Sequence, residues 1–453
     1  MEDLKYKSEE RVRNHRRERE RKAENSTRKS TRNSARGSAR NSTRNSTRNS
    51  ARTSGASAKS KPEVSADIDR EKTKRKGRFK LFSVRSGMDM PFFFLVLVLL
   101  VVGIVMMFSA SYAFAYYTMG DSYYYLIRQA IFAVIGVGIM IALSFLDYHH
   151  LHKLAVIVLG IAFALLVIVL FVPAINGVHR WLNLGLFSFQ ASEVLKFAII
   201  LFYAHWASIY FEQMSTVKYG VLPAVAIAIP SIILLILEPH YSCIVIVTML
   251  FAIMMWISGV KARWFVIGVC VVVAAFFIMQ ATGLLKYAME RLDGWGMALE
   301  ENLSSEMQDA VWQTMNSLYA IGSGGLTGLG LGQSREKYLY LPEPQNDFVF
   351  AVIVEELGLI GGIIVLAIFA LLIWRGIMIS LRAKDRFGML LGVGLISQVG
   401  LQVVLNILVI TDTLPNTGIS LPFFSYGGSS LVMLLAQMGI VLSISRSANI
   451  NKT

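Results

Sequence analysis

The sequence predicts an all-α, polytopic membrane protein with ten transmembrane helices. Of its 453 residues, 54% are hydrophobic, and the mean hydropathy of +0.52 is typical of membrane proteins. Ten apolar runs follow the first 88 residues, each near the ~20 residues that a helix needs to cross a bilayer. They lie at residues 90–113, 126–146, 154–174, 191–210, 219–237, 241–258, 264–282, 347–374, 387–410 and 423–444.

The first 88 residues form a tail of different composition. They hold 27 Lys and Arg against 11 Asp and Glu, a net charge of +16, whereas the remaining 365 residues have a net charge of −2. Arginine recurs every fourth residue from Arg28 to Arg52, with too little apolar surface to offset the entropy of ordering. Residues 1–88 are therefore expected to be a disordered, basic cytoplasmic tail. Because the tail is tethered to a membrane, we expect no nucleic-acid partner.

The distribution of Lys and Arg predicts the orientation of the helices. With a cytoplasmic N-terminus, the short extracytoplasmic loops contain Arg180 as their only basic residue. The basic run at 72–82 either anchors this orientation or also binds anionic lipid. Residues 89–446 then form one multi-pass membrane domain, with extracytoplasmic segments at 174–190 and 283–346. An even number of spans returns the C-terminus, 447–453, to the cytoplasm.

The first extracytoplasmic segment reads NGVHRWLNLGLFSFQASEVLKF and turns into a helix. Arg180 could bind a phosphate through two donors, and Trp181 suits the membrane interface. Glu193 and Lys196 lie three residues apart, on one helical face. They either pair and satisfy each other within the membrane, or line an outward-facing cavity with Arg180.

The second segment ends in SLYAIGSGGLTGLGLGQSREKYLYLPEP and leads into an apolar helix. Its glycines either let backbone approach a ligand or simply mark an irregular loop. Lys337 adds positive charge near the membrane surface. Asp347 stands where the polar loop ends, and Glu355 and Glu356 lie about 12 Å deeper at the helical rise. Carboxylates within an apolar span are costly, so we expect them to be functional or paired.

The last loop reads TDTLPNTGISLPFFSYGGSSL and supplies hydroxyl groups, among them Ser425. These hydroxyls either cap the next helix or contact a ligand. The sequence contains no P-loop, GxSxG, HExxH or zinc-ligand spacing. Cys243 and Cys270 both lie in apolar runs, which predicts no disulfide framework and no metal site.

Three segments together resemble the SEDS family (shape, elongation, division and sporulation). They read GVHRWLNLG…FQASEVLK, YAIGSGGLTGLGLGQS…KYLYLPEPQNDFVFAVIVEELG and LPNTGISLPFFSYGGSSL, in that order. The resemblance covers about residues 90–445. Asn346 before Asp347, with the SGGLTGLGLGQS run, is closer to the division branch, FtsW, or its sporulation relative than to the elongation branch. Two positions depart from the family pattern: Ala191 replaces the usual proline, and His240 replaces the usual aspartate.

The resemblance implies a peptidoglycan glycosyltransferase of the bacterial cell membrane, acting in cell division. Such an enzyme polymerises lipid II into β-1,4-linked glycan strands and releases undecaprenyl diphosphate. Inversion in a single displacement needs a base on the acceptor hydroxyl and positive charge on the diphosphate. Asp347 is the predicted catalytic base. The predicted substrate-binding residues are Arg180, Trp181, Glu193, Lys196, Lys337 and Ser425.

The resemblance also implies partners and leaves alternatives. The expected partners are the substrate lipid II, a class B penicillin-binding protein transpeptidase and divisome membrane proteins. No dedicated metal cage is visible, although a divalent cation such as Mg²⁺ could share the binding of the diphosphate. An elongation- or sporulation-type polymerase is the alternative within the family. A lipid II flippase or transporter, or a non-catalytic scaffold for the transpeptidase, is the alternative from another class.

Overall fold

The computed structural model describes residues 87–173, 180–183, 188–281, 294–300 and 304–448. The predicted disordered tail, 1–88, lies almost wholly outside the described residues. Each of the ten predicted apolar runs coincides with one helix. They are α3 (Met90–Met119), α4 (Tyr124–Phe145), α5 (His149–Leu170), α6 (Ala191–Ile209), α7 (Leu222–Leu237), α8 (Tyr241–Ile257), α9 (Arg263–Ala281), α12 (Val349–Leu381), α13 (Arg386–Ile410) and α14 (Gly428–Ser447).

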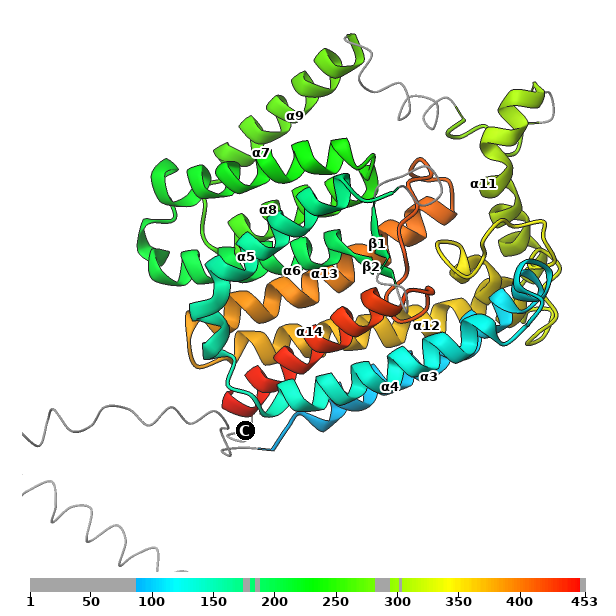
Figure 1. Cartoon of the computed structure of the whole chain (residues 1–453), viewed down its shortest axis with the longest axis horizontal. Coiled ribbons are helices and arrows are strands. Elements are labelled where there is room, and N and C mark those ends of the chain that lie inside the picture. Colours follow the sequence, from blue (N-terminus) through cyan, green and yellow to red (C-terminus); the bar gives the residue numbers. More distant parts are fainter. Residues whose placement is uncertain (1–86, 174–179, 184–187, 282–293, 301–303, 449–453) are drawn as a thin grey trace, which may run out of the picture. The chain divides into compact units, whose positions relative to one another are not determined.

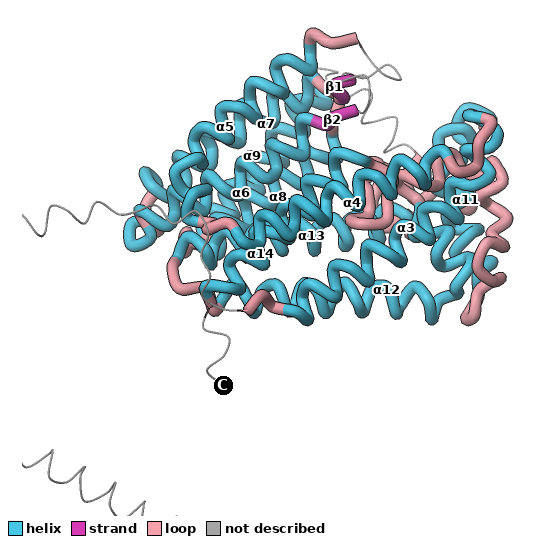
Figure 2. The backbone as a smooth tube through the Cα atoms, turned by 60° about the horizontal axis from the view of Figure 1, so that its bottom comes forward, coloured by secondary structure: helices cyan, strands magenta, loops and turns pink. Residues whose placement is uncertain are grey.

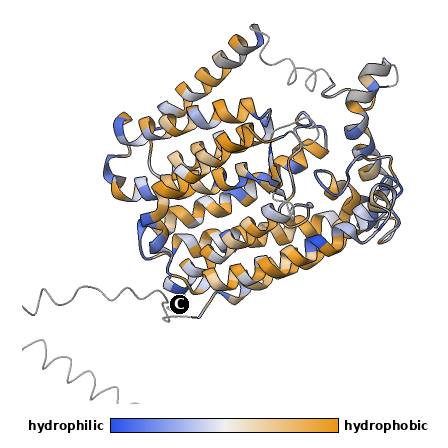
Figure 3. Cartoon of the chain, viewed as in Figure 1, coloured by the Kyte–Doolittle hydropathy of each residue, from blue (hydrophilic) through white to orange (hydrophobic). Residues whose placement is uncertain are grey.

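The all-α membrane prediction is confirmed. Eight of these helices are long and apolar enough to cross a membrane, with α7 counted together with the π-helical turn η2 (Val217–Val221) that precedes it. The other two predicted spans, α8 and α9, supply shorter apolar stretches at Tyr241–Ile257 and Arg263–Ala274. Figure 3 shows the apolar colouring along the helices and the polar colouring at many of their ends.

Local signals in the sequence explain where several helices begin. Asp89 caps α3 by accepting a hydrogen bond from the Phe92 N–H at 3.0 Å, and Pro91 fits the first turn. The same Asp89 carboxylate pairs with Arg375 of α12 at 2.8 Å, which joins the two helices. Asp385 caps α13 through the Gly388 N–H at 2.8 Å.

The helices pack so that α14 lies along α4 and α5 along α6, while α13 contacts α6, α8 and α12 (Figure 1). We call the end of the bundle that carries the starts of α6, α12 and α14 the cavity end. Along α13, small residues permit close packing: a Cβ at Gly394 would lie 2.6 Å from Ile200 of α6. Consequently α13 forms a central column of the bundle.

A short hairpin precedes α6. Strand β1 (Trp181–Asn183) pairs with β2 (Ser188–Gln190) in antiparallel register, with Trp181 opposite Gln190 (Figure 2). Residues 184–187, between the two strands, lie outside the described residues. Helix α6 begins at Ala191, directly after β2. Ala191 is thus the first residue of this helix, and Glu193 lies in its first turn.

The 283–346 segment contains a helix that the sequence reading took as part of a long polar loop. Helix α11 (Ser305–Gly324) is capped by Ser304, which accepts from the Met307 N–H at 3.3 Å. Its C-terminal glycine, Gly324, lies against α12, because a Cβ there would come within 2.1 Å of the Val354 carbonyl oxygen. The segment is thus folded onto the membrane bundle where it is described.

Helix α12 is interrupted at Gly358, whose backbone has φ of 72° and ψ of −179°. The glycine-rich segment after α11, residues 325–332, packs against this interruption. Leu329 and Gly330 donate to the carbonyls of Glu355 and Glu356, and Leu359 donates to the Gly325 carbonyl, all at 2.9–3.0 Å. The glycines therefore allow close approach, as expected, but the partner is this chain's own helix.

Candidate active site

A cavity of about 590 Å³ opens at the cavity end of the bundle. Its walls come from segments far apart in the sequence: α4, the β1–β2 hairpin, α6, the α7–α8 junction, the segment before α12, and the α13–α14 loop. Six of the seven predicted site residues line it: Arg180, Trp181, Glu193, Lys196, Asp347 and Ser425. Lys337 does not.

Asp347 is half-buried, two residues before α12 begins. Its carboxylate lies over the backbone of the α13–α14 loop, because a Cβ built on Gly418 would be 2.8 Å from Asp347 Oδ2. Gly418 has a φ of +69°, a conformation that favours glycine. The loop that faces Asp347 is therefore shaped to let backbone approach the carboxylate.

Glu193 and Lys196 form an ion pair within the first two turns of α6, with Lys196 Nζ 2.8 Å from Glu193 Oε1. Both are buried, at 8% and 3% exposure, yet both line the cavity. The two sequence interpretations are thus compatible, since the residues pair with each other and also face the cavity. The pair brings a buried cation to the wall without adding net charge.

Arg180 is anchored at the start of the hairpin. Its guanidinium donates to the carbonyl of Glu238 at 3.3 Å and to the carbonyl of Pro239, both at the α7–α8 junction. These bonds leave the side chain half-buried at the cavity wall. Arg180 thus brings a guanidinium, held by carbonyl oxygens of the α7–α8 junction, to this wall.

His240, one of the two positions that depart from the family pattern, lies at the α7–α8 junction. His240 lines the cavity and is 9% exposed. Burial lowers the pKa of His240 to about 3, with Arg180 and Lys196 contributing in the same direction. Burial raises the pKa of Glu238 to about 8, although Arg180 opposes this shift. His240 therefore brings an imidazole with a strongly lowered pKa to the cavity wall.

Trp181 and Ser425 lie on separate parts of the cavity wall. Trp181 belongs to β1, beside Arg180. The Ser425 hydroxyl accepts from the Leu421 N–H at 2.7 Å, a bond within its own loop. Ser425 thus shapes the α13–α14 loop and faces the cavity, whereas the next helix, α14, begins after it without a side-chain cap.

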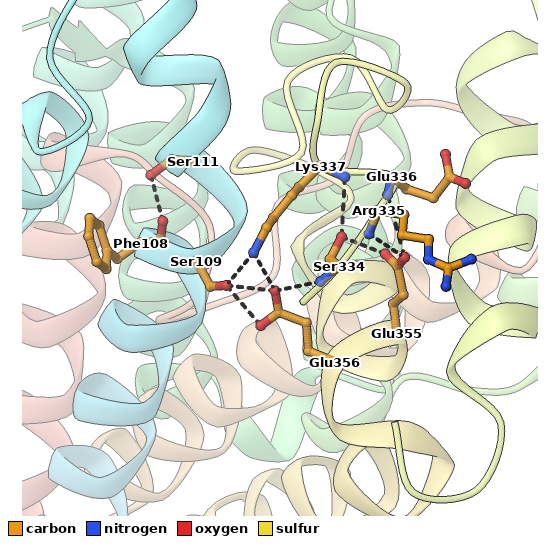
Figure 4. A network of polar contacts seen from close by, with 9 residues as sticks. All are labelled: Phe108, Ser109, Ser111, Ser334, Arg335, Glu336, Lys337, Glu355 and Glu356. Atoms are coloured by element: carbon orange, nitrogen blue, oxygen red, sulfur yellow. Dashed lines mark hydrogen bonds and ion pairs between the residues drawn. The ribbon is translucent and has the colours of Figure 1, made fainter. Parts of the chain in front are cut away.

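Lys337 lies in a different, enclosed network (Figure 4). Its Nζ is 2.8 Å from Glu356 Oε1 and 3.3 Å from Ser109 Oγ of α3, and the residue is 2% exposed overall. Glu356 also accepts from Ser109 Oγ at 2.7 Å. Neighbouring Glu355 accepts from Ser334 Oγ and the Arg335 N–H at 2.5 and 2.7 Å. The two deep carboxylates therefore hold the 326–337 loop against the membrane helices.

Several polar lining residues escaped the sequence reading. Arg128 lies in the first turns of α4, 4.2 Å from the ring centre of Tyr124, and lines the cavity. A charged residue at the start of an apolar run was the available signal. Amide side chains from the middle of α13 and α14 also line it: Gln398, Gln402 and Gln437. The i, i+4 spacing of the first two was their signal.

The donor set of the described residues does not favour a resident metal ion. Among the described residues no three His, Cys, Asp or Glu side chains gather as ligands. Along the cavity, Glu193 is paired with Lys196, and the other lining carboxylates are Glu343 and Asp347. A divalent cation would therefore depend on oxygen atoms supplied by an anionic ligand.

The cavity combines a half-buried carboxylate with cations from three separate elements. Arg128, Arg180 and Lys196 are the cationic lining residues within the described chain. In a low-dielectric wall, fixed positive charge stabilises an anion more strongly than it would in water. The arrangement suits proton abstraction by Asp347 next to a bound or departing anion.

Comparison with known proteins agrees with these features. A sequence model of the FtsW/RodA/SpoVE family, described as cell cycle proteins, matches residues 90–450. The chain is 38% identical over 368 residues to stage V sporulation protein E of Bacillus subtilis, covering 80% of this chain and 98% of that protein. It is 34% identical over 352 residues to the probable peptidoglycan glycosyltransferase FtsW of Geobacter sulfurreducens, covering 76% and 91%.

Solved structures give the same picture. A chain from a peptidoglycan synthase complex that coordinates polymerization and crosslinking superposes with a TM-score of 0.65 at 25% identity, covering 81% of this chain and 99% of that one. The rod shape determining protein RodA of Thermus thermophilus superposes with a TM-score of 0.56 at 25% identity, covering 80% of this chain and 98% of that one. The chain therefore belongs to the SEDS family of FtsW, RodA and SpoVE.

Proposed function

We propose that this protein is a peptidoglycan glycosyltransferase that polymerises lipid II into β-1,4-linked glycan strands. One observation carries the proposal: Asp347 lines the same cavity as Arg180 and Lys196, which come from a distant part of the chain. A base and cations are the two requirements of glycosyl transfer from a diphosphate-linked donor. The names of the FtsW relatives point to the same activity.

Asp347 acts on the acceptor in this proposal. Its carboxylate removes the proton from the 4-hydroxyl of the acceptor GlcNAc as that oxygen attacks the anomeric carbon of the donor sugar. The new C–O bond forms while the bond to the diphosphate oxygen breaks, and its electron pair leaves with undecaprenyl diphosphate. One displacement converts an α-linked donor into a β-linked product, so no covalent enzyme intermediate is required.

The cations act on the leaving group. Arg180 and Lys196 balance the charge that develops on the diphosphate, and Glu193 holds Lys196 in place at 2.8 Å. Arg128 lies on the same cavity and joins this set. Trp181 and Ser425 contact the substrate from the hairpin and the α13–α14 loop. Lys337 is left out, because Glu356 and Ser109 enclose it. Any Mg²⁺ would be held mainly by the diphosphate oxygens.

Replacement of Asp347 by asparagine tests the proposal. Full-length Asp347→Asn protein, purified and supplied with labelled lipid II, should make glycan strands ~10²–10⁴-fold more slowly, because base catalysis is lost. Ser111→Ala is a suitable control, since the hydrogen bonds of its hydroxyl to described residues stay within α3. Normal strand synthesis by a folded Asp347→Asn variant would refute the base. Lipid translocation without strands would indicate a flippase, and neither activity would indicate a scaffold.

The division branch is the finer proposal. Asn346 before Asp347 and the glycine-rich run support the division or sporulation branch over the elongation branch, and the names of the FtsW relatives point to septal cell wall synthesis. The 38% identity to the B. subtilis sporulation protein, against 34% for the FtsW relatives, makes a sporulation-type polymerase the second candidate. A fluorescent fusion in the source organism separates them: localisation to the vegetative septum supports the first, and appearance only in sporulating cells supports the second.

A class B penicillin-binding protein and divisome membrane proteins are the proposed partners. Support comes from the solved relative, whose complex coordinates polymerization and crosslinking. Copurification of the transpeptidase with the full-length chain from membranes tests this. Recovery of the chain without any transpeptidase, under conditions that keep the membrane protein folded, would contradict it.

We also propose that the cavity end faces away from the cytoplasm and that both termini are cytoplasmic, in the plasma membrane. The Lys and Arg distribution supports this orientation. A Ser305→Cys variant, in a background without Cys243 and Cys270, should react with an impermeant thiol reagent on intact spheroplasts. Reaction only after the membrane is opened would reverse the topology and place the site inside.

A further inference from the structure

The backbone of Asp347 is held by a side chain that does not line the cavity. Asp347 precedes α12, so regular helical hydrogen bonds do not begin until after it. Its backbone carbonyl instead accepts a hydrogen bond from Asn406 Nδ2 of α13 at 2.8 Å. The same Nδ2 donates to the carbonyl of Ile419 at 2.6 Å. Asn406 is fully buried. One side chain thus links the segment before α12 to the α13–α14 loop.

The chemistry of this link specifies an amide. Both acceptors are carbonyl oxygens, so the group between them must supply two N–H donors. An aspartate of the same shape supplies none, and a leucine leaves both carbonyls without this partner. An unpaired buried carbonyl costs about 1–3 kcal/mol. The two carbonyl acceptors therefore require that the amide nitrogen of Asn406, and not its amide oxygen, faces them.

The second acceptor connects Asn406 to the carboxylate. Ile419 follows Gly418, whose backbone lies against Asp347 Oδ2. On the other side of Asp347, the Tyr426 N–H donates to the Gln345 carbonyl at 2.8 Å. The α13–α14 loop is consequently joined to the Asp347 segment at two points, at Ile419 through the Asn406 side chain and at Tyr426 through its own N–H.

We propose that Asn406 is a positioning residue that fixes the Asp347 carboxylate relative to the cations of the cavity. The inference rests on the proposed function. Asn406 does not itself line the cavity, so it acts on the reaction through the two backbone segments that it holds, at Asp347 and at Ile419. A displacement of a reacting group by about 1 Å costs on the order of 10²-fold in rate. Loss of Asn406 should therefore lower kcat strongly and leave KM for lipid II nearly unchanged.

The test uses full-length protein, labelled lipid II and five variants. Asn406→Leu and Asn406→Asp should each lower kcat by about 10–100-fold, with KM within about twofold and a shifted acidic limb of the pH–rate profile. Ser317→Ala is the matched control, because the buried Ser317 hydroxyl also bonds to α13, at the Ile410 carbonyl, at 3.0 Å. It should keep kcat and the pH profile. Asn406→Asp retains the shape of the side chain, so it remains informative if the leucine variant does not fold.

A double variant separates a positioning role of Asn406 from a purely structural role. In an Asp347→Asn background, adding Asn406→Leu should cause no further loss, because both changes remove the same contribution. Additive losses, or an unchanged pH profile with lower yield of folded protein, would overturn the positioning role. If Asp347→Asn alone keeps normal synthesis, the proposed function fails first. If only the Asn406 variants remain fully active, the proposed function stands and this inference fails.

Discussion

Two buried Glu–Lys pairs serve this molecule differently. Glu193–Lys196 and Glu356–Lys337 both join at 2.8 Å, and both lysines are at most 3% exposed. The first pair lines a 590 Å³ cavity beside Arg180 and Asp347. The second is closed in by Ser109 and the Ser334 N–H. The two pairs therefore share the distance between their charged atoms and the burial of their lysines, but differ in their surroundings.

The surroundings of an ion pair, more than its geometry, therefore indicate its role. A buried pair is weak evidence for stability, whereas removing one partner leaves an uncompensated charge. Around Lys196 there is space for an anion and a second cation. Around Lys337 the neighbouring donors and acceptors belong to the protein. We infer that the first pair serves the substrate and the second holds the 326–337 loop on α12.

The largest expected effect comes from neutralising the cavity pair. Glu193→Gln combined with Lys196→Met removes both charges at once, so expression should recover relative to either single variant. Polymerisation should nevertheless stay at least ~10²-fold below wild type, because one donor to a developing anion contributes about that much. Strand synthesis from labelled lipid II measures it. A double variant with near-normal activity would make this pair a structural salt bridge and leave Arg180 as the main anion ligand.

The enclosed pair should respond in the opposite way. Lys337→Met alone leaves Glu356 charged and buried, which should destabilise the protein by about 3–5 kcal/mol and reduce the yield of folded protein. Adding Glu356→Gln should restore most of the yield and bring polymerisation to within about tenfold of wild type. Yield by size-exclusion chromatography and the same polymerisation assay check both statements. A well-folded double variant without activity would return Lys337 to the active site.

Sequence reasoning predicted the helices well because the bilayer imposes one length and one polarity on them. It placed α6 and α13 within a residue or two, since apolar runs are local signals. It overlooked α11, because that helix is polar for most of its length and carries no span-like run.

The site was only partly predictable for a physical reason. Asp347, Arg180, Glu193 and Lys196 stand at the polar ends of apolar runs, where a charge is conspicuous. Lys337 lies in the loop before such a run, and its partner Ser109 lies 228 residues away. Likewise, Asn406 reaches Asp347 across 59 residues. Which residues meet across such distances depends on helix packing, which a single sequence does not display.

The smallest expected effect concerns Ser109, the third member of the enclosed network. Its hydroxyl donates to Glu356 at 2.7 Å and accepts from Lys337 at 3.3 Å (Figure 4). Ser109→Ala removes these hydrogen bonds while the ion pair and the Ser334 N–H remain. Hydrogen bonds between membrane helices average about 0.6 kcal/mol, so the apparent Tm should fall by about 2 °C or less.

Ser111 of the same helix provides the comparison for this measurement. Among the described residues its hydroxyl bonds to Phe108 and Met107, both within α3, so Ser111→Ala should leave the Tm within error of wild type. Both variants should polymerise lipid II at the wild-type rate, because neither residue lines the cavity. A marked loss of polymerisation in Ser109→Ala, with an unchanged Tm, would show that a change in the enclosed network alters the active site. The contrast between the two Glu–Lys pairs would then no longer hold.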